Sequence, residues 1–194
     1  TGICEDLLGP GYGLNGGDGN FYSGDTGWHS DVGGDHWQHK TVTRHLKIAF
    51  YLDPVTRDTG ALRVIPGSHH YGDAYTTRLN DLGALGLAGR DVPSVALETM
   101  PGDLVLFDHR IKHAAFGGGN RRRMFTMNLQ QECLTQAQRE SFMHVMRWYH
   151  EVEHIRALFR PEWVAAAPPE RLRRLAPSIE MWDEMARSVA LAPV

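Results

Sequence analysis

The sequence predicts a mainly β fold with flanking helices, and two observations lead to that prediction. Between about residues 20 and 131, short apolar runs alternate with turns rich in Gly, Pro and Asp, a pattern typical of sandwiches and barrels. Between about residues 135 and 190, apolar residues recur at steps of three, four or seven, which indicates amphipathic helices. No repeat or linker separates the two parts, so a single domain covering residues 1–194 is expected.

The predicted strands follow one another closely. They cover a short segment at 21–22 and then residues 46–52, 61–65, 95–99, 104–107, 111–116 and 122–130. Turn sequences such as Asp53-Pro54, Pro66-Gly67 and Pro101-Gly102-Asp103 separate them. The rest of residues 1–27 is rich in Gly, Asp and Asn and is predicted to form turns and loops. Residues 71–92 are predicted to be a loose insert with one short helix.

The predicted helices come after Thr135. The first covers 136–159, where apolar residues from Phe142 onward fall on one face, and Pro161 is expected to end it. A short helix is expected at about 170–175. The last helix is predicted to begin near Ser178, an N-cap residue type after Pro177, and to run to about residue 190.

Composition excludes several classes of function. The 194 residues carry a formal net charge of −3, which argues against a nucleic-acid partner. The apolar runs are too short to span a bilayer, so no membrane contact is expected. Cys4 and Cys133 are the only cysteines, which predicts no disulfide framework and favours a reducing, cytoplasmic location. The start at Thr1 rather than Met is compatible with a missing N-terminal segment, and the oligomeric state is not indicated.

The segment Gly27-Trp28-His29-Ser30-Asp31 places an imidazole and a carboxylate two residues apart at a predicted strand or strand end. Side chains at i and i+2 of a strand point the same way, so His29 and Asp31 converge while Ser30 faces away. They supply two ligands of the 2-His-1-carboxylate triad, which binds non-haem Fe(II) and leaves positions open. Because the pattern is short and recurs by chance, its weight depends on a third ligand.

His113 is the better candidate for the third ligand, because it lies in the predicted strand 111–116. His109 is the rival. It follows Asp108 at a strand end, where a histidine more often caps the strand or faces solvent.

Arg121-Arg122-Arg123 opens the last predicted strand, shortly after His113. Three arginines in a row usually form a solvated turn. Here apolar residues follow at once, so at least one guanidinium is expected to be buried. A guanidinium can bind a carboxylate through two parallel hydrogen bonds, which suits a dicarboxylate co-substrate.

Several motifs occur together in one order between residue 20 and about residue 130. They are His29-x-Asp31, KIAFYLD at 47–53, DTGAL at 58–62, IPGSH at 65–69, PGDL at 101–104, His113 and the arginine cluster. This order resembles the phytanoyl-CoA dioxygenase family of Fe(II)/2-oxoglutarate-dependent oxygenases. The resemblance implies a double-stranded β-helix core, the jelly-roll or cupin-like fold, with the C-terminal helices outside the matched region.

The resemblance also implies a site and its cofactors. Fe(II) is expected to be held by His29, Asp31 and His113. An arginine is expected to bind the distal carboxylate of 2-oxoglutarate, with Arg122 the best match and Arg123 the runner-up. O2 would be the oxidant, and succinate and CO2 would be released.

Further residues are expected to line the pocket. Lys47 falls where related enzymes place a side chain lining the 2-oxoglutarate pocket. Just before the triad, three residues are expected to line the substrate mouth, namely Asn20, Tyr22 and Trp28.

One position departs from the family pattern. Members often have a serine two residues after the distal histidine, which helps bind the co-substrate, and this chain has Ala115 there. Another hydroxyl, such as that of Thr126, would have to assist the arginine. Related halogenases replace the carboxylate ligand by a small residue, whereas Asp31 is present here. Hydroxylation of a small organic substrate is therefore the expected reaction.

A competing metal motif is His150-Glu151-Val152-Glu153-His154, which matches the H-E-x-x-H pattern of zinc metallopeptidases. Glu180 is the arguable third ligand. The charge of Glu153 inside the motif argues against a buried zinc helix, so a solvated helix face is the preferred interpretation. A non-catalytic jelly roll that binds a small ligand is the third hypothesis.

Other histidines give weaker signals, although eleven is a high number for this length. His36, His39 and His45 follow the triad in a polar stretch, and exposure at the surface is expected for them. His69 lies in the Pro-Gly-Ser-His turn and is expected to have a structural role.

Overall fold

The computed structural model of the chain describes residues 2–31, 42–119 and 122–190. The chain divides into two compact units. Unit 1 contains residues 1–16, 38–45 and 128–194, and unit 2 contains residues 17–37 and 46–127. That residues 1–194 act as a single domain stays a prediction.

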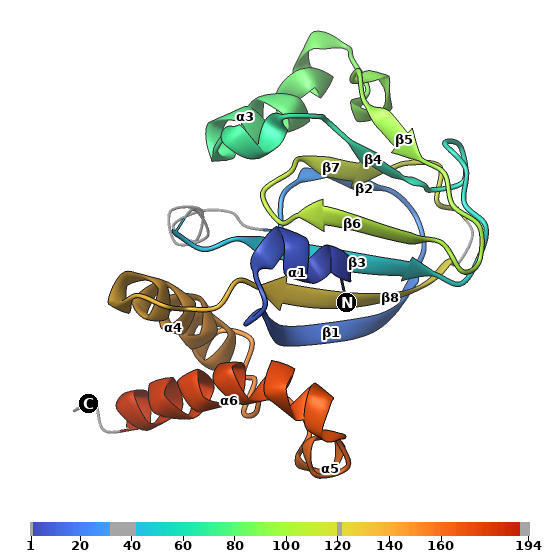
Figure 1. The fold of residues 1–194 in the computed structure, drawn as a ribbon. Coiled ribbons are helices and arrows are strands. Elements are labelled where there is room, and N and C mark those ends of the chain that lie inside the picture. Colours follow the sequence, from blue (N-terminus) through green and yellow to red (C-terminus); the bar gives the residue numbers. More distant parts are fainter. Residues whose placement is uncertain (1, 32–41, 120–121, 191–194) are drawn as a thin grey trace. The chain divides into compact units, whose positions relative to one another are not determined.

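The strands form two four-stranded sheets (Figure 1). One sheet has the order β1-β8-β3-β6 and the other β2-β7-β4-β5. Their bounds are β1 Gly13–Tyr22, β2 Thr26–His29, β3 His45–Tyr51, β4 Leu62–Val64, β5 Val95–Leu97, β6 Leu104–Asp108, β7 His113–Ala115 and β8 Arg122–Gln130. β3 pairs antiparallel with β6, and β7 pairs antiparallel with both β2 and β4. Two sheets of short strands with flanking helices confirm the predicted jelly-roll class.

The core of unit 2 lies between strands of the two sheets. Its buried apolar residues are Ala49, Tyr51, Val55, Ala61, Val105 and Phe107. The insert that follows β4 contains the expected short helix, and it also contains three 3-10 helices that were not expected. It contains η1 Ser68–His70, α3 Asp73–Asn80, η2 Asp81–Leu85 and η3 Gly89–Asp91.

Glycines conceal β1 in the sequence. The prediction placed only residues 21–22 in a strand, whereas a helix, α1 (Gly2–Leu8), and the long strand β1 occupy this region. A β-carbon on Gly17 would lie 2.6 Å from the carbonyl oxygen of Thr126, so the close approach of the two backbones requires glycine there. The strand forms through backbone pairing with β8, which leaves no alternating apolar pattern to detect.

The helices of unit 1 confirm the predicted apolar stripe. α4 (Gln136–Glu151) begins at the N-cap Thr135, which forms a capping box with Gln138. The buried residues that join α4 to α6 (Pro169–Ala190) are Phe142, Val145, Met146, Met181, Trp182 and Met185. A short helix, α5 (Pro161–Ala165), lies between them in the chain.

Two helix boundaries differ from the prediction. α4 ends at Glu151 rather than Phe159, because Val152 and Ile155 beyond it are exposed and give the segment no buried face. α6 continues through Pro177, where two helices were expected. A proline removes one hydrogen bond from a helix interior, and burial of the same helix on both sides of Pro177 offsets that loss. The buried residues before and after it are Leu175, Met181 and Met185.

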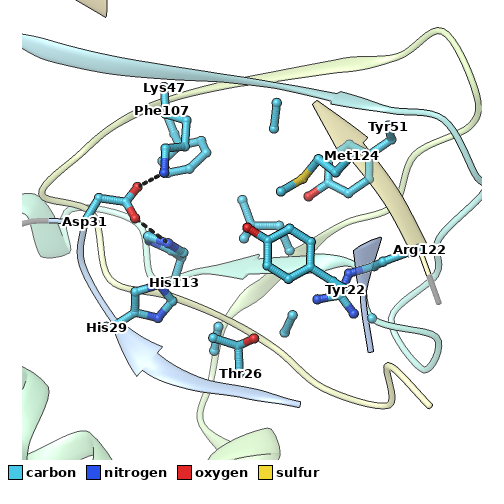
Figure 2. Close-up of a pocket in the computed structure, with 15 residues that line it drawn as sticks. Tyr22, Thr26, His29, Asp31, Lys47, Tyr51, Phe107, His113, Arg122 and Met124 are labelled. Atoms are coloured by element: carbon cyan, nitrogen blue, oxygen red, sulfur yellow. Dashed lines mark ion pairs between the residues drawn. The ribbon is translucent and has the colours of Figure 1, made fainter. Parts of the chain in front are cut away.

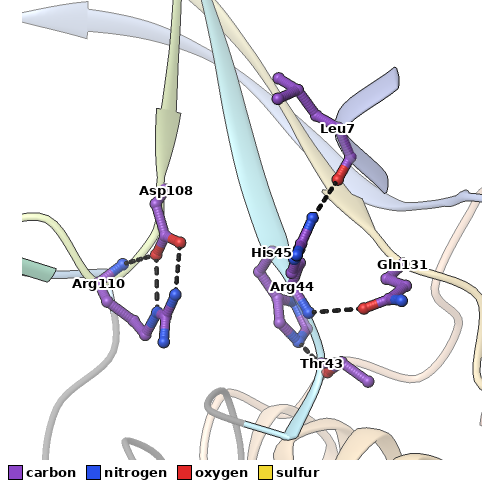
Figure 3. A network of polar contacts seen from close by, with 7 residues as sticks. All are labelled: Leu7, Thr43, Arg44, His45, Asp108, Arg110 and Gln131. Carbon is purple, nitrogen blue, oxygen red and sulfur yellow. Dashed lines mark hydrogen bonds and ion pairs between the residues drawn. The ribbon is translucent and has the colours of Figure 1, made fainter. Parts of the chain in front are cut away.

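Polar contacts fix the chain just before β3. In unit 1, the Arg44 side chain donates to the carbonyl of Leu7 at 3.1 Å, and its backbone N–H donates to Oε1 of Gln131 at 3.4 Å (Figure 3). His45 is 6% exposed and hydrogen-bonded to Thr43 at 2.8 Å. The expectation that His45 lies at the surface is therefore wrong, because its ring is buried with a polar partner. His36 and His39 lie outside the described residues.

Among the helices that the structure describes, none has both the length and the apolar character needed to cross a membrane.

Candidate metal centre

His29, Asp31 and His113 come together in unit 2. Each offers one ligand atom, and these atoms all lie within 4.8 Å of one another. His29 ends β2 and stands directly opposite His113 on β7 in the antiparallel register, which puts both imidazoles on one face. Asp31 follows two residues later, and its backbone N–H donates to the carbonyl of His109 at 2.9 Å. Within the described ranges, no other group of this kind could hold a metal ion.

Backbone carbonyls orient both imidazoles. Nδ1 of His29 lies 2.9 Å from the carbonyl oxygen of Gly27, and Nδ1 of His113 lies 3.0 Å from that of Ile111. A carbonyl oxygen can only accept, so Nδ1 is the protonated nitrogen in each ring. Nε2 is then the nitrogen with a free lone pair, and the Nε2 atom of His113 faces Asp31 at 3.7 Å. In metal sites, a hydrogen bond from the other ring nitrogen to a carbonyl in this way fixes the orientation of the histidine ring.

The carboxylate of Asp31 has a lysine ammonium beside it. Lys47 Nζ lies 3.0 Å from its Oδ2 and forms an ion pair with it. Burial alone would raise the pKa of Asp31, but the nearby His113 and Lys47 outweigh it and lower that pKa. The carboxylate is therefore held in its charged form, ready to bind a cation.

His113 is the most buried of the three, at 4% exposure. Burial lowers the pKa of His113 to about 4, against the opposing effect of Asp31. The ring stays neutral at ordinary pH, which is the form that binds metals. The rival His109 is also buried, but it lies outside this cluster and contributes only its carbonyl.

A buried lysine ties the two halves of the centre together. The side chain of Lys112 is fully buried, and its Nζ donates to Ser30 Oγ at 3.1 Å. Its backbone N–H donates to Ser68 Oγ at 2.8 Å. Since Ser30 lies between two candidate ligands and Lys112 precedes the third, this contact fastens the end of β2 to the start of β7.

The centre lines one side of a pocket within unit 2 (Figure 2). Lys47, Ala49 and Tyr51 alternate along β3 and face inward, as do Arg122 and Met124 on β8. The remaining lining residues are Tyr22, Thr26, His29, Asp31, Gly60, Leu62, Phe107, His113, Ala114 and Ala115. Strands of both sheets thus contribute to one cavity.

The two candidate arginines have opposite surroundings. Arg122 is 7% exposed, lines the pocket with its guanidinium over the ring of Tyr22, and has an Nη1 atom without a partner among the described residues. Arg123 points away from the pocket, and its side chain is 53% exposed and paired with Asp53 at 2.7 Å. Only Arg122 is placed to meet a ligand in this cavity.

The three residues expected at the substrate mouth lie in different surroundings. Tyr22 lines the pocket, but Asn20 does not. Trp28 is 2% exposed, packs against Phe116, and donates from Nε1 to the carbonyl of Gly89 at 2.9 Å. Its indole belongs to a core cluster and has no surface left for a substrate.

The hydroxyl groups of the pocket differ from the one expected. Thr126 is outside the lining, and its Oγ1 donates to Asp18 at 3.4 Å. Tyr51 and Thr26 line the pocket instead, and sequence reasoning missed both. The signal for Tyr51 was its alternation with Lys47 along one strand.

Glycine makes room for the guanidinium of Arg122. A β-carbon on Gly118 would overlap both Nη1 of Arg122 and the carbonyl oxygen of Gly24. We expect Gly118→Ala to destabilise the fold by about 1–3 kcal/mol, the usual cost of overpacking. Urea denaturation measures this. Gly119→Ala is the matched control, because nothing lies within 4 Å of a β-carbon there; equal midpoints for the two variants would contradict the expectation.

The H-E-x-x-H segment does not form a metal site. His150 lies on α4, but the helix ends at Glu151 and His154 has a positive φ of 56°. The two histidines therefore do not share a helix face. His150 Nε2 instead lies 3.4 Å from Arg156 Nη1. The peptidase alternative has no support in this geometry.

Three solved structures illustrate what this chain is similar to. EvdMO1 superposes with a TM-score of 0.51 at 17% identity, covering 68% of this chain and 30% of that one. EvdO2 from Micromonospora carbonacea var. aurantiaca, complexed with 2-oxoglutarate, superposes with a TM-score of 0.49 at 24% identity, covering 68% of this chain and 58% of that one. EctD from S. alaskensis with bound Fe superposes with a TM-score of 0.48 at 24% identity, covering 66% of this chain and 48% of that one.

The likeness to EvdMO1 shows the shared fold, and the chain spans less than two thirds of each of these three structures. No curated protein sequence matches the chain. The family model described as Phytanoyl-CoA dioxygenase (PhyH) matches residues 18–124, more than half of the sequence. This region contains the candidate metal centre and Arg122, and the chain belongs to the phytanoyl-CoA dioxygenase family.

Proposed function

We propose that this protein is an Fe(II)- and 2-oxoglutarate-dependent dioxygenase that hydroxylates a small organic substrate and releases succinate and CO2. The supporting observation is the convergence of His29, Asp31 and His113 in a pocket that also holds the buried Arg122. Figure 2 shows the three candidate ligands grouped on one side and Arg122 on the other. A substrate of small size is proposed because the centre lies within a pocket rather than on an open face.

The residues fit an iron ion. The two imidazoles have their Nδ1 protons committed to backbone carbonyls, which leaves two nitrogen donors for a metal. Asp31 supplies a carboxylate whose charged form Lys47 favours from 3.0 Å, so an anionic oxygen ligand stands beside the two nitrogens. Two imidazoles and one carboxylate are the donor set of the non-haem Fe(II) oxygenases.

The other residues of the pocket have roles that follow from their positions. Arg122 lines the pocket and offers its guanidinium to the distal carboxylate of the co-substrate. Lys47 balances the charge of Asp31 and lines the same cavity. Phe107 and Met124 form apolar walls that limit water. When bound, Fe(II) and 2-oxoglutarate together supply the activation of O2.

Succinate formation with and without metal tests this function. We expect the protein to convert 2-oxoglutarate into succinate with Fe(II) and O2, slowly even without the true substrate. Removal of the metal by a chelator should abolish the reaction, and added Fe(II) should restore it. The described residues contain no second group that could hold a metal ion in place of this centre.

The alternatives give different results in the same assays. Binding of 2-oxoglutarate without any turnover would favour a non-catalytic jelly roll. Peptidase activity that is lost in Glu151→Gln would favour the zinc hypothesis. Absence of both iron binding and succinate would contradict the oxygenase proposal.

A further inference from the structure

Lys112 is a buried lysine directly before the candidate ligand His113, and its exposed fraction is 0%. Lysine is almost never fully buried unless its ammonium has a partner, because a buried charge loses its hydration. Packing alone does not account for a lysine here, since an unbranched methionine would fill similar space without that cost. The burial of the ammonium therefore needs a reason, and its contact with Ser30 supplies one.

The backbone of Lys112 is held on both sides. Its N–H donates to Ser68 Oγ at 2.8 Å, and its carbonyl accepts from the N–H of Ile65 at 3.0 Å. Ser68 is itself fully buried. The side chain of Lys112 thus starts from a fixed point, and its Nζ donates to Ser30 Oγ at 3.1 Å.

Asp31 is the ligand candidate that lies outside the strands. β2 ends at His29, so the ladder between β2 and β7 fixes His29 and His113, whereas Asp31 follows beyond it. Two hydrogen bonds reach this segment from the stretch before β7. One joins the N–H of Asp31 to the carbonyl of His109 at 2.9 Å, and the other is the lysine contact with Ser30. Neighbouring side chains of an extended segment point to opposite sides, so fixing Ser30 also directs the carboxylate.

We propose that Lys112 is a positioning residue for the metal centre and holds Asp31 in place through the hydroxyl of Ser30. The inference rests on the proposed function, because it assigns Lys112 a role toward the metal that this function requires. Lys112 is not a member of the ligand cluster and acts only through its neighbour.

The charge of Lys112 makes the proposal sharp. A positive ammonium close to a cation site opposes metal binding. Removal of that charge would by itself strengthen metal binding, whereas loss of the positioning contact would weaken it. The sign of the change in metal affinity therefore distinguishes a positioning role from a purely electrostatic one.

Lys112→Met removes the ammonium and keeps an unbranched side chain. The full chain is titrated without O2, once with Fe(II) and once with Co(II), whose visible absorption reports the coordination. We expect both metals to bind at least about tenfold more weakly, as for other partners that orient metal ligands. The Co(II) absorption should change shape, because a displaced carboxylate alters the coordination. The urea midpoint of the metal-free variant should equal or exceed that of the wild type, because an apolar side chain replaces a buried charge.

Two variants of Ser30 test whether its hydroxyl carries the effect. Ser30→Ala should weaken metal binding as Lys112→Met does. Ser30→Thr keeps a hydroxyl and should bind Fe(II) within about twofold of the wild type. The double variant Lys112→Met/Ser30→Ala should lose no more affinity than the weaker-binding single variant, because both changes break one contact. Additive losses would overturn the connection through Ser30.

Ser68→Ala is the matched control, because it removes a buried hydroxyl that contacts the backbone of Lys112 rather than its ammonium. It should lower the urea midpoint, since a buried N–H loses its acceptor, and should change Fe(II) affinity by less than about twofold. Equal losses of affinity in Ser68→Ala and Lys112→Met would overturn the role of the ammonium. Unchanged or tighter metal binding in Lys112→Met would do the same.

The wild type separates this proposal from the proposed function. If it bound neither Fe(II) nor Co(II), the metal centre would be wrong and the role of Lys112 with it. If it bound both metals and the variants behaved as expected, but no succinate formed, the proposed reaction would fail while the positioning role of Lys112 would be supported.

Discussion

Replacing Asp31 with alanine is expected to lower succinate formation by more than about a hundredfold. The carboxylate is the only anionic ligand candidate in the cluster, and the partners that merely orient metal ligands are already worth 10- to 100-fold. Its loss also leaves Lys47 Nζ, now 3.0 Å from Asp31, without a counter-charge beside the metal. The positive lysine would then oppose the binding of a cation. Succinate release and Fe(II) affinity measure the two effects separately.

Asp53→Ala is the control for this prediction. Asp53 is an aspartate whose partner, Arg123, points away from the pocket. Succinate formation should stay near the wild-type rate in this variant. If Asp31→Ala instead kept wild-type turnover and iron affinity, the triad assignment would be wrong.

Local periodicity and motif order together predicted the candidate ligands. His29 and Asp31 were expected to converge as i and i+2 of a strand, and the structure brings them together although Asp31 lies just beyond the end of β2. The choice of His113 over His109 followed from its place within a strand, since a residue paired in the ladder has a fixed face. Motif order then indicated the family, and with it the jelly roll.

The pocket depends on which strands are neighbours, and a single sequence does not contain that information. Thr126 shares the strand phase of Arg122 and was the reasonable hydroxyl, but it lies farther along β8 and bonds to Asp18. Tyr51 and Arg122 line the same pocket because β3 and β8 are adjacent in the sheet. Trp28 was expected at the substrate mouth and lies in the core instead, for a related reason. A large apolar residue beside a site is more often needed by the core, and the indole fills a cluster with Phe116.

Arg122→Met is expected to weaken 2-oxoglutarate binding by roughly a hundredfold or more, since breaking a buried ion pair typically costs 3–5 kcal/mol. The guanidinium is 7% exposed, and water cannot replace it efficiently in the cavity. Methionine keeps most of the apolar stem, so the loss reflects charge rather than packing. The measurement is the KM for 2-oxoglutarate in succinate formation, together with the Kd of the metal-loaded protein. Fe(II) affinity should change little, because Arg122 is not part of the ligand cluster.

Arg123→Met separates this role from a general effect of positive charge. The two arginines are adjacent on one strand, so their side chains point to opposite faces of the sheet. One faces the pocket, and the other pairs with Asp53 outside it. If the site reads its ligand by direct contact, Arg123→Met should alter the KM by less than about twofold, since screened surface charges act weakly at a distance. Equal losses in both variants would mean that the arginine cluster acts only through its overall field. A larger loss in Arg123→Met would mean that the distal carboxylate binds elsewhere than beside Arg122.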